Sequence, residues 1–278
     1  MYYLFPGCLN LYRFPEYELS AQKVLARLGI ETCSLDGQIC CGGFVESRTE
    51  NWKLMAAYNL SLAERQGAGL ITLCGGCTNV FRRLIHMCRQ DRQLLRVINQ
   101  KLNQLGLTFE NRVEVKHVLQ VLAENKKQVA AQVVRKLSKR AALVYPCQVF
   151  RPDYILDFDD ARRPRSMAEL ADVLGLQIVH YAGEYACCGS TLQLSHQEVA
   201  FQMGAQRIKA MEEARAELMV TACGNCHLLL ARLQSQYYKP VIAGYFITQL
   251  VGIAMGLSPL EVMLERARSV LLIDGAVS

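Results

Sequence analysis

Two copies of one cysteine pattern constrain this chain more than any other feature. Ten of its 12 cysteines fall into two sets with the same order: a single cysteine, an adjacent Cys-Cys pair, and a C-x-x-C motif. The first set is Cys8, Cys40, Cys41, Cys74 and Cys77, and the second set is Cys147, Cys187, Cys188, Cys223 and Cys226. Recurrence of one pattern at nearly constant spacing predicts two homologous structural repeats in a single chain.

Both repeats show the same alternation of short apolar runs and amphipathic stretches. Predicted strands cover 2–5, 69–73, 141–145 and 218–222, and predicted helices cover 16–28, 51–65, 78–88, 167–174, 198–214 and 227–233. Strands that alternate with helices are typical of parallel sheets flanked by helices. We therefore predict an α/β fold of two homologous repeats. Cysteines that directly follow strands would lie in loops at the carboxyl ends of those strands, where such folds place their sites.

The repeats divide the chain into four predicted parts. These are a first cysteine-rich repeat (1–88), a polar helical connector without a counterpart (89–140), a second cysteine-rich repeat (141–240) and a C-terminal helical segment (241–278). Residues 241–257 carry no charge. We interpret them as a buried helix, because a bilayer span needs about 20 residues. Contact of this segment with a membrane surface is the alternative interpretation. Ser258-Pro259-Leu260-Glu261 predicts a capping box before an amphipathic final helix.

Composition excludes several classes of protein. A chain of 278 residues can bury a core without disulfides. A hydrophobic fraction of 51% with a net charge of +6 excludes intrinsic disorder. The lysines and arginines are dispersed, so nucleic-acid binding is not expected. The first residues lack a basic region and a long apolar run, so we expect no secretory signal and a cytoplasmic location. Thiols stay reduced there, which favours metal-binding or redox roles.

Three kinds of site remain open for five cysteines at this spacing. Disulfides are disfavoured in a reducing compartment. Zinc takes four ligands, so one cysteine of each set would be left over. An iron–sulfur cluster is favoured because thiolates are its usual ligands and nearby glycines let the backbone approach the inorganic sulfides. The glycines beside the motifs are Gly7, Gly42, Gly43, Gly75, Gly76, Gly183, Gly189 and Gly224.

The complete cysteine pattern resembles the duplicated cysteine-rich CCG domain of the heterodisulfide reductase B subunit family. The resemblance covers nearly the whole chain and includes the endings Ile247-Thr248-Gln249-Leu250 and Gly256-Leu257-Ser258-Pro259. It implies two 4Fe-4S clusters of a non-cubane type, one held by each set of five cysteines. It also implies that a disulfide is cleaved between the clusters. Two motif details differ from those of the methanogen subunits: Cys41 is followed by Gly42, and Cys147 by Gln148.

The resemblance also implies roles for individual residues. The catalytic positions would be Cys8, Cys41, Cys147 and Cys188. His227 follows Cys226 directly and is a candidate hydrogen-bond or proton donor.

Residues outside these roles have simpler interpretations. Cys33 and Cys88 lie outside both sets and are interpreted as small buried hydrophobic residues. Asn79 and Asn225 are candidate donors to sulfur. Arg82 and Arg83 are interpreted as part of a solvated helix face.

The resemblance predicts an oxidoreductase subunit that acts only with partners. The chain has no G-x-G-x-x-G fingerprint, so we expect it to bind neither nucleotide nor flavin. Electrons would come from an HdrC-like subunit with cubane iron–sulfur clusters and, beyond it, a flavoprotein. The predicted function is reduction or formation of a small disulfide substrate. An electron-transfer or membrane-associated subunit of an unusual succinate dehydrogenase or fumarate reductase is the alternative, and a zinc-binding scaffold without redox function is a third hypothesis.

Overall fold

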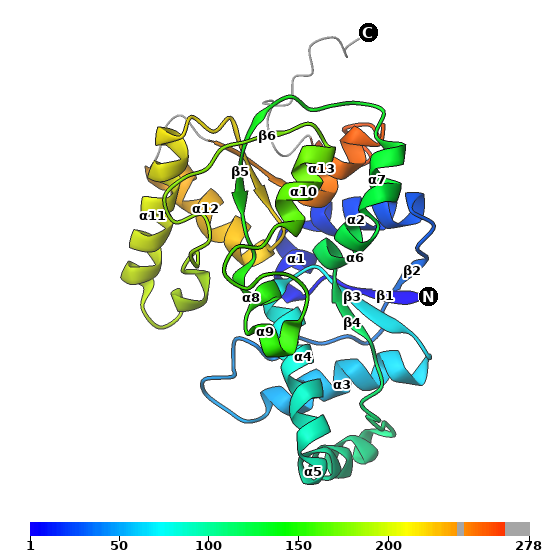
Figure 1. Cartoon of the computed structure of the whole chain (residues 1–278). Helices are drawn as coiled ribbons and strands as arrows, with labels where there is room; N and C mark the ends of the chain where they lie inside the picture. The colour runs from blue at the N-terminus through cyan, green and yellow to red at the C-terminus, as the bar shows by residue number, and fades with distance from the viewer. Residues whose placement is uncertain (238–241, 265–278) are drawn as a thin grey trace.

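The computed structural model describes residues 1–237 and 242–264, and within them two four-stranded parallel sheets share one topology (Figure 1). The strand orders are β2-β1-β3-β4 and β6-β5-β7-β8. The first sheet consists of β1 (Tyr2–Phe5), β2 (Thr32–Ser34), β3 (Gly69–Thr72) and β4 (Val115–His117). The second consists of β5 (Arg140–Val144), β6 (Gln177–Ile178), β7 (Leu218–Thr221) and β8 (Ala243–Phe246). The predicted α/β fold of two repeats is confirmed.

Helices connect the strands in the same sequence in both repeats. In the first repeat they are α1 (Cys8–Arg13), α2 (Pro15–Arg27), α3 (Trp52–Arg65), α4 (Gly75–Gln90), α5 (Arg92–Leu102), α6 (Val118–Glu124) and α7 (Lys126–Gln132). In the second they are α8 (Cys147–Phe150), α9 (Asp153–Leu156), α10 (Ser166–Val173), α11 (Gln197–Glu213), α12 (Gly224–Tyr237) and α13 (Ile247–Ala254). By position along the chain, α2, α3, α4 and α6 correspond to α10, α11, α12 and α13.

The central strands of each sheet are buried on both faces, as is usual where helices cover a parallel sheet. Successive side chains of a strand point to opposite faces. Leu4 of β1 therefore joins a core that both repeats share, whereas Phe5 joins the apolar cluster that includes α3 and α4. Leu143 and Val144 of β5 divide in the same way.

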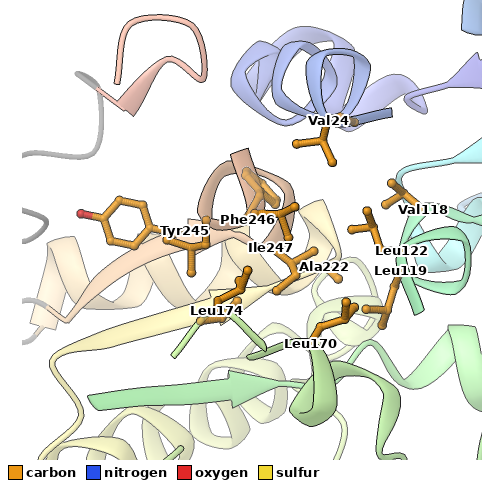
Figure 2. Close-up of a cluster of buried hydrophobic side chains, with 14 of the residues drawn as sticks. Val24, Val118, Leu119, Leu122, Leu170, Leu174, Ala222, Tyr245, Phe246 and Ile247 are labelled. Atoms are coloured by element: carbon orange, nitrogen blue, oxygen red, sulfur yellow. The ribbon is translucent and has the colours of Figure 1, made fainter. Parts of the chain in front are cut away.

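The shared core is formed by α2, α6, α10 and α13 between the sheets. Figure 2 shows Val24 and Val118 of the first repeat facing Leu170 and Ile247 of the second. The ring of Tyr17 stacks on that of Phe246 with their centroids 4.0 Å apart. Because these side chains come from both repeats, the two repeats pack as one unit.

The segment 89–140 is more than the helical connector that the sequence predicts. It contains β4, which pairs with β3 through Leu70 and Val115, and α6. These two elements correspond to β8 and α13 at the end of the second repeat. The sequence does not predict this strand, because the strand has only three residues and Lys116 lies at its centre. The domain boundaries themselves remain a prediction.

The uncharged stretch 241–257 likewise differs from a single buried helix. Its described part begins as β8 and continues as α13, whose residues are all buried. Ser258 N–H donates to a Glu261 carboxylate oxygen at 2.8 Å, and Glu261 N–H donates to Ser258 Oγ at 3.3 Å, as a capping box requires. The final helix predicted after it lies largely outside the described residues. Among the helices that the structure describes, none has the length and apolar character to cross a bilayer.

Candidate metal centre

The strands bring the cysteines of each set to the same edge of their sheet. Cys8 begins α1 shortly after β1, and Cys74 is the N-cap of α4 and is separated from β3 by Leu73. In the second repeat, Cys147 begins α8 after β5, and Cys223 lies between β7 and α12. The carboxyl ends of neighbouring parallel strands share one edge, so single cysteines and C-x-x-C motifs meet there.

The glycine after each Cys-Cys pair holds the first thiol of the pair. Gly42 N–H lies 3.4 Å from Cys40 Sγ, and Gly189 N–H lies 3.3 Å from Cys187 Sγ. These glycines have φ angles of +89° and +91°, in the left-handed region that L side chains rarely adopt. A Cβ on Gly42 would also lie 2.9 Å from the Cα of Trp52. This backbone conformation explains why the Cys-Cys-Gly triplet occurs twice.

Thiols within each set are close enough to interact. Cys8 Sγ lies 3.8 Å from Cys40 Sγ, and the equivalent pair, Cys147 and Cys187, is 4.0 Å apart. All 12 cysteines have free thiols in the structure. Hydrogen bonds from the Cys41 and Cys8 thiols lower the pKa of Cys40, with a further contribution from Gly42 N–H.

The second set repeats this electrostatic arrangement. Hydrogen bonds from the Cys147 and Cys188 thiols lower the pKa of Cys187, with a further contribution from Gly189 N–H. Each set therefore contains a thiol that favours the thiolate form, which is the form that binds metal.

The two sets also contact each other across the boundary between the repeats. The Asn225 side-chain amide, from the second C-x-x-C motif, points at Cys74 Sγ of the first motif at 3.6 Å. The pKa of Cys223 is lowered by hydrogen bonds from Cys226 and Cys74. The motifs thus approach within hydrogen-bonding distance of one another.

Reciprocal packing holds the motifs in this position. A Cβ on Gly224 would lie only 1.8 Å from Asn10 Oδ1, and a Cβ on Gly75 would lie 3.3 Å from Val149 Cγ2. Asn10 and Val149 each follow the single cysteine of their own repeat by two positions. Each C-x-x-C glycine therefore packs against the equivalent residue of the other repeat.

A cavity of about 500 Å³ opens over the first cysteine set. Its walls contain four cysteines of that set: Cys8, Cys41, Cys74 and Cys77. Second-repeat residues Gln148, Thr191 and Asn225 complete the cavity. The same three residues line a smaller cavity, of about 20 Å³, over all five cysteines of the second set. The two thiol sets therefore lie on either side of one shared wall.

His227 is placed away from both of these cavities. Its ring stacks on Phe246 with the centroids 4.3 Å apart and meets Phe14 edge-on, and its Nδ1 lies 3.0 Å from Thr221 Oγ1. Burial lowers the pKa of His227 to about 4. The equivalent residue Thr78 makes the corresponding hydrogen bond to Thr72. The structure therefore gives His227 a packing position behind the motif, and its predicted catalytic role gains no support.

Other residues that the sequence singles out have structural contacts. Asn79 donates to the carbonyl oxygen of Arg151 at 2.7 Å and anchors the second repeat. Arg82 does not belong to a solvated face as predicted, because it is half-buried and donates to the carbonyl oxygen of Ile155 at 3.0 Å. Arg83 forms an ion pair with Glu46 at 2.5 Å, beside the large cavity.

Sequence reasoning misses several residues of the site. Gln148 stands out in the sequence only as a departure from a motif, and its position beside Cys147 is the available signal. Thr191 gives none, because it lies in a short 3-10 helix (Ser190–Leu192) that packs against α11 and α12, and only folding brings it to the cavity. Arg207, which lies beside Cys187, has no sequence signal either.

The donor groups fit an iron–sulfur cluster. Each set offers five thiols, and thiolates are the usual protein ligands of such clusters. Backbone N–H groups point at two of these sulfur atoms, as in the hydrogen bonds that clusters accept. Within the described ranges, no group of three or more His, Cys, Asp or Glu side chains is arranged to bind a single metal ion.

Comparisons with known proteins agree with this picture. Residues 2–82 and 141–231 each match the cysteine-rich domain family CCG. The B subunit of the ferredoxin:CoB-CoM heterodisulfide reductase of Methanosarcina mazei is 26% identical over 275 residues, which cover 95% of this chain and 92% of that protein. The predicted resemblance to heterodisulfide reductase B subunits is confirmed.

Two further comparisons extend the range of relatives. The membrane anchor subunit of the 8-methylmenaquinol:fumarate reductase of Wolinella succinogenes is 28% identical over 272 residues, with 94% of each chain covered. A hypothetical protein from Helicobacter pylori has a similar fold, with a TM-score of 0.74 at 16% identity. That match covers 95% of this chain and 50% of the other.

Proposed function

Since the chain belongs to the CCG cysteine-rich domain family, we propose that it is the iron–sulfur catalytic subunit of a heterodisulfide reductase-like complex. It reduces, or forms, a disulfide bond in a small substrate. One observation carries this proposal: Gln148, Thr191 and Asn225 line both the large cavity over the first cysteine set and the small cavity over the second. A substrate in the large cavity would contact the first set directly and would be separated from the second set by these three residues.

The proposed cofactors are two 4Fe-4S clusters of a non-cubane type, one for each set of five cysteines. When bound, they would supply the two electrons that cleavage of a disulfide requires. The chain's own groups hold this site together: the glycine N–H groups donate to Cys40 and Cys187, and the Asn225 amide donates to Cys74.

The proposed reaction converts R–S–S–R′, two electrons and two protons into R–SH and R′–SH. The electrons come from an HdrC-like cubane iron–sulfur subunit and a flavoprotein, which we propose as partners. A reducing cytoplasm suits the free thiols. The large cavity offers the substrate polar side chains from Gln148 and Asn225 and an apolar rim that includes Phe44 and Leu194.

Metal analysis of anaerobically purified protein tests the cofactors first. We expect about eight iron and about eight acid-labile sulfide per chain, four of each per 4Fe-4S cluster. Cys41→Ser and Cys188→Ser should each remove the spectrum of one cluster and about half of the iron. Cys33→Ser is the matched control and should keep both, because Cys33 lies on β2 outside the sets. Zinc without sulfide would favour the scaffold hypothesis instead.

Disulfide reduction by reduced viologen dye tests the activity itself. The wild type and Cys33→Ser should reduce a small disulfide, and Cys41→Ser and Cys188→Ser should not. A fully loaded protein that transfers electrons but leaves every tested disulfide intact would contradict the proposed reaction.

A second candidate function is electron transfer within a fumarate reductase-type complex. The 28% identity to the Wolinella succinogenes membrane anchor subunit favours it. Membrane binding that resists high salt but not detergent, together with absent disulfide reduction, would support this function over the first.

A further inference from the structure

Arg207 of α11 holds the loop that carries the second Cys-Cys pair. Its side chain is buried, with 4% of the residue exposed. Nη1 donates to the carbonyl oxygen of Ala186 at 2.5 Å, and Nη2 donates to that of Glu184 at 2.6 Å. Ala186 directly precedes Cys187. The guanidinium therefore lies against the backbone that positions this thiol.

The positive charge of Arg207 has only neutral hydrogen-bond partners within the described part of the chain. The remaining donors, Nε and Nη2, point at the Tyr181 hydroxyl at 3.1 and 3.0 Å. No carboxylate forms an ion pair with Arg207 there. A buried charge without an opposite charge is unfavourable, so an anionic group nearby would stabilise it.

The second cysteine set is the anionic group within reach. Cys187 and Arg207 line a common surface cavity of about 300 Å³. The hydrogen bond from Arg207 to the carbonyl oxygen of Ala186 fixes the guanidinium beside Cys187, where a bound cluster would add negative charge.

The first repeat uses a neutral residue for the same task. Asn59 of α3 is fully buried and occupies the equivalent place. Its Oδ1 accepts from Ile39 N–H at 2.9 Å, and its Nδ2 donates to the carbonyl oxygen of Cys40 at 3.5 Å. Ile39 precedes Cys40 as Ala186 precedes Cys187. A buried side chain of the following helix therefore holds each loop through its backbone, and only Arg207 carries a positive charge.

We propose that Arg207 gives the second cysteine set the higher reduction potential, so that electrons which enter the chain move from the first set toward the second. This rests on the proposed function, in which each set holds one cluster. Reduction adds one negative charge to a site, and a buried cation beside that site favours the reduced form because charges interact strongly where water is excluded. The Asn225 amide near Cys74 acts in the opposite sense, but it carries no net charge.

A redox titration of the anaerobic protein, followed by electron paramagnetic resonance, tests the proposal. Cys41→Ser and Cys188→Ser identify which signal belongs to which set. In the wild type the second set should be reduced first. In Arg207→Gln, which keeps hydrogen-bond donors and removes the charge, the equilibrium for one electron between the sets should shift at least tenfold toward the first. A tenfold shift corresponds to 59 mV for a one-electron couple.

Two further variants separate charge from structure. Arg207→Lys keeps the charge and should retain most of the wild-type potential. Arg232→Gln removes an exposed arginine from α12 and should leave both potentials unchanged. If Arg207→Gln fails to retain clusters, the order in which the two sets are reduced in the wild type and the potentials of Arg207→Lys still test the proposal.

Several results would overturn the proposal. A first set that is reduced before the second in the wild type would contradict it, as would an unchanged potential in a fully loaded Arg207→Gln. Neither result would contradict the proposed disulfide reduction, because that activity is measured in a separate assay. Wild-type protein without iron and sulfide would instead overturn the proposed function.

Discussion

At the scale of single residues, the backbone conformation of Gly42 is the most restrictive feature of the site. Its φ of +89° positions the N–H for Cys40, and the space where a Cβ would lie is filled by Trp52. Gly67 has a φ of +63°, but a Cβ added there would meet nothing within 4 Å. The two glycines thus share a left-handed backbone and differ in the space around them.

Gly42→Ala should therefore destabilise the protein more than Gly67→Ala. The left-handed conformation costs a non-glycine residue about 1–2 kcal/mol at either position. At Gly42 the contact with Trp52 should add about 1 kcal/mol or more, since overpacking of a dense core typically costs about 1–3 kcal/mol. Urea unfolding of both variants measures the difference. Equal losses would show that the loop after the Cys-Cys pair adjusts freely.

At the scale of elements, the contact between α2 and α13 joins the repeats. Ser20 and Thr248 are fully buried, and their hydroxyl oxygens lie 2.7 Å apart. Tyr17 on the same helix as Ser20 donates to the carbonyl oxygen of Ala222 at 3.0 Å. The Ser20–Thr248 contact specifies how the faces of α2 and α13 align, and Tyr17 joins α2 to the residue that follows β7.

A double-mutant cycle should detect this coupling. Ser20→Ala and Thr248→Val should each destabilise the protein by about 1–3 kcal/mol, because each leaves the other hydroxyl without this partner. The double variant should be more stable than the sum of the two losses predicts, by about 1 kcal/mol. Ser20→Ala combined with a change at exposed Ser235 is the additive control. Strict additivity in the first cycle would contradict a coupled pair.

Helices with an amphipathic pattern and strands that run into a cysteine were predictable from the sequence, and short strands without such a signal were not. The strands before Cys8 and Cys74 have apolar runs that end in a recognisable motif. The strand β4 has three residues with a lysine at its centre, so no periodic signal marks it. Residues 241–257 carry no charge and few polar side chains, so no periodic pattern marks the boundary between β8 and α13. Arg207 could not be found because its partners, among them Tyr181, are brought to it only by folding.

At the scale of the whole molecule, one core extends through both repeats. Leu4 and Ile71 of the first sheet belong to the same buried cluster as Leu143 and Val220 of the second. Neither sheet can therefore lose its helices without exposing the core of the other.

We expect the two repeats to unfold in one transition. Trp52 is the single tryptophan, is buried, and lies in the first repeat, so its fluorescence reports that repeat alone. Far-ultraviolet circular dichroism reports the helices of both. The two signals should have the same urea midpoint, because coincident probes indicate a cooperative transition. Two separate midpoints would show that the repeats are independent folding units.

The reciprocal contacts of Gly75 with Val149 and of Gly224 with Asn10 have the form of an isologous interface, in which the same patch on two equivalent bodies pairs with itself. Two identical subunits joined in this way would have to carry the same residue beside both cysteine sets. Joining the two halves in one polypeptide removes that restriction. Evolution could then place an amide at position 59 and a guanidinium at position 207. Such a difference would let electrons move preferentially from one cysteine set to the other, which two identical subunits would not allow.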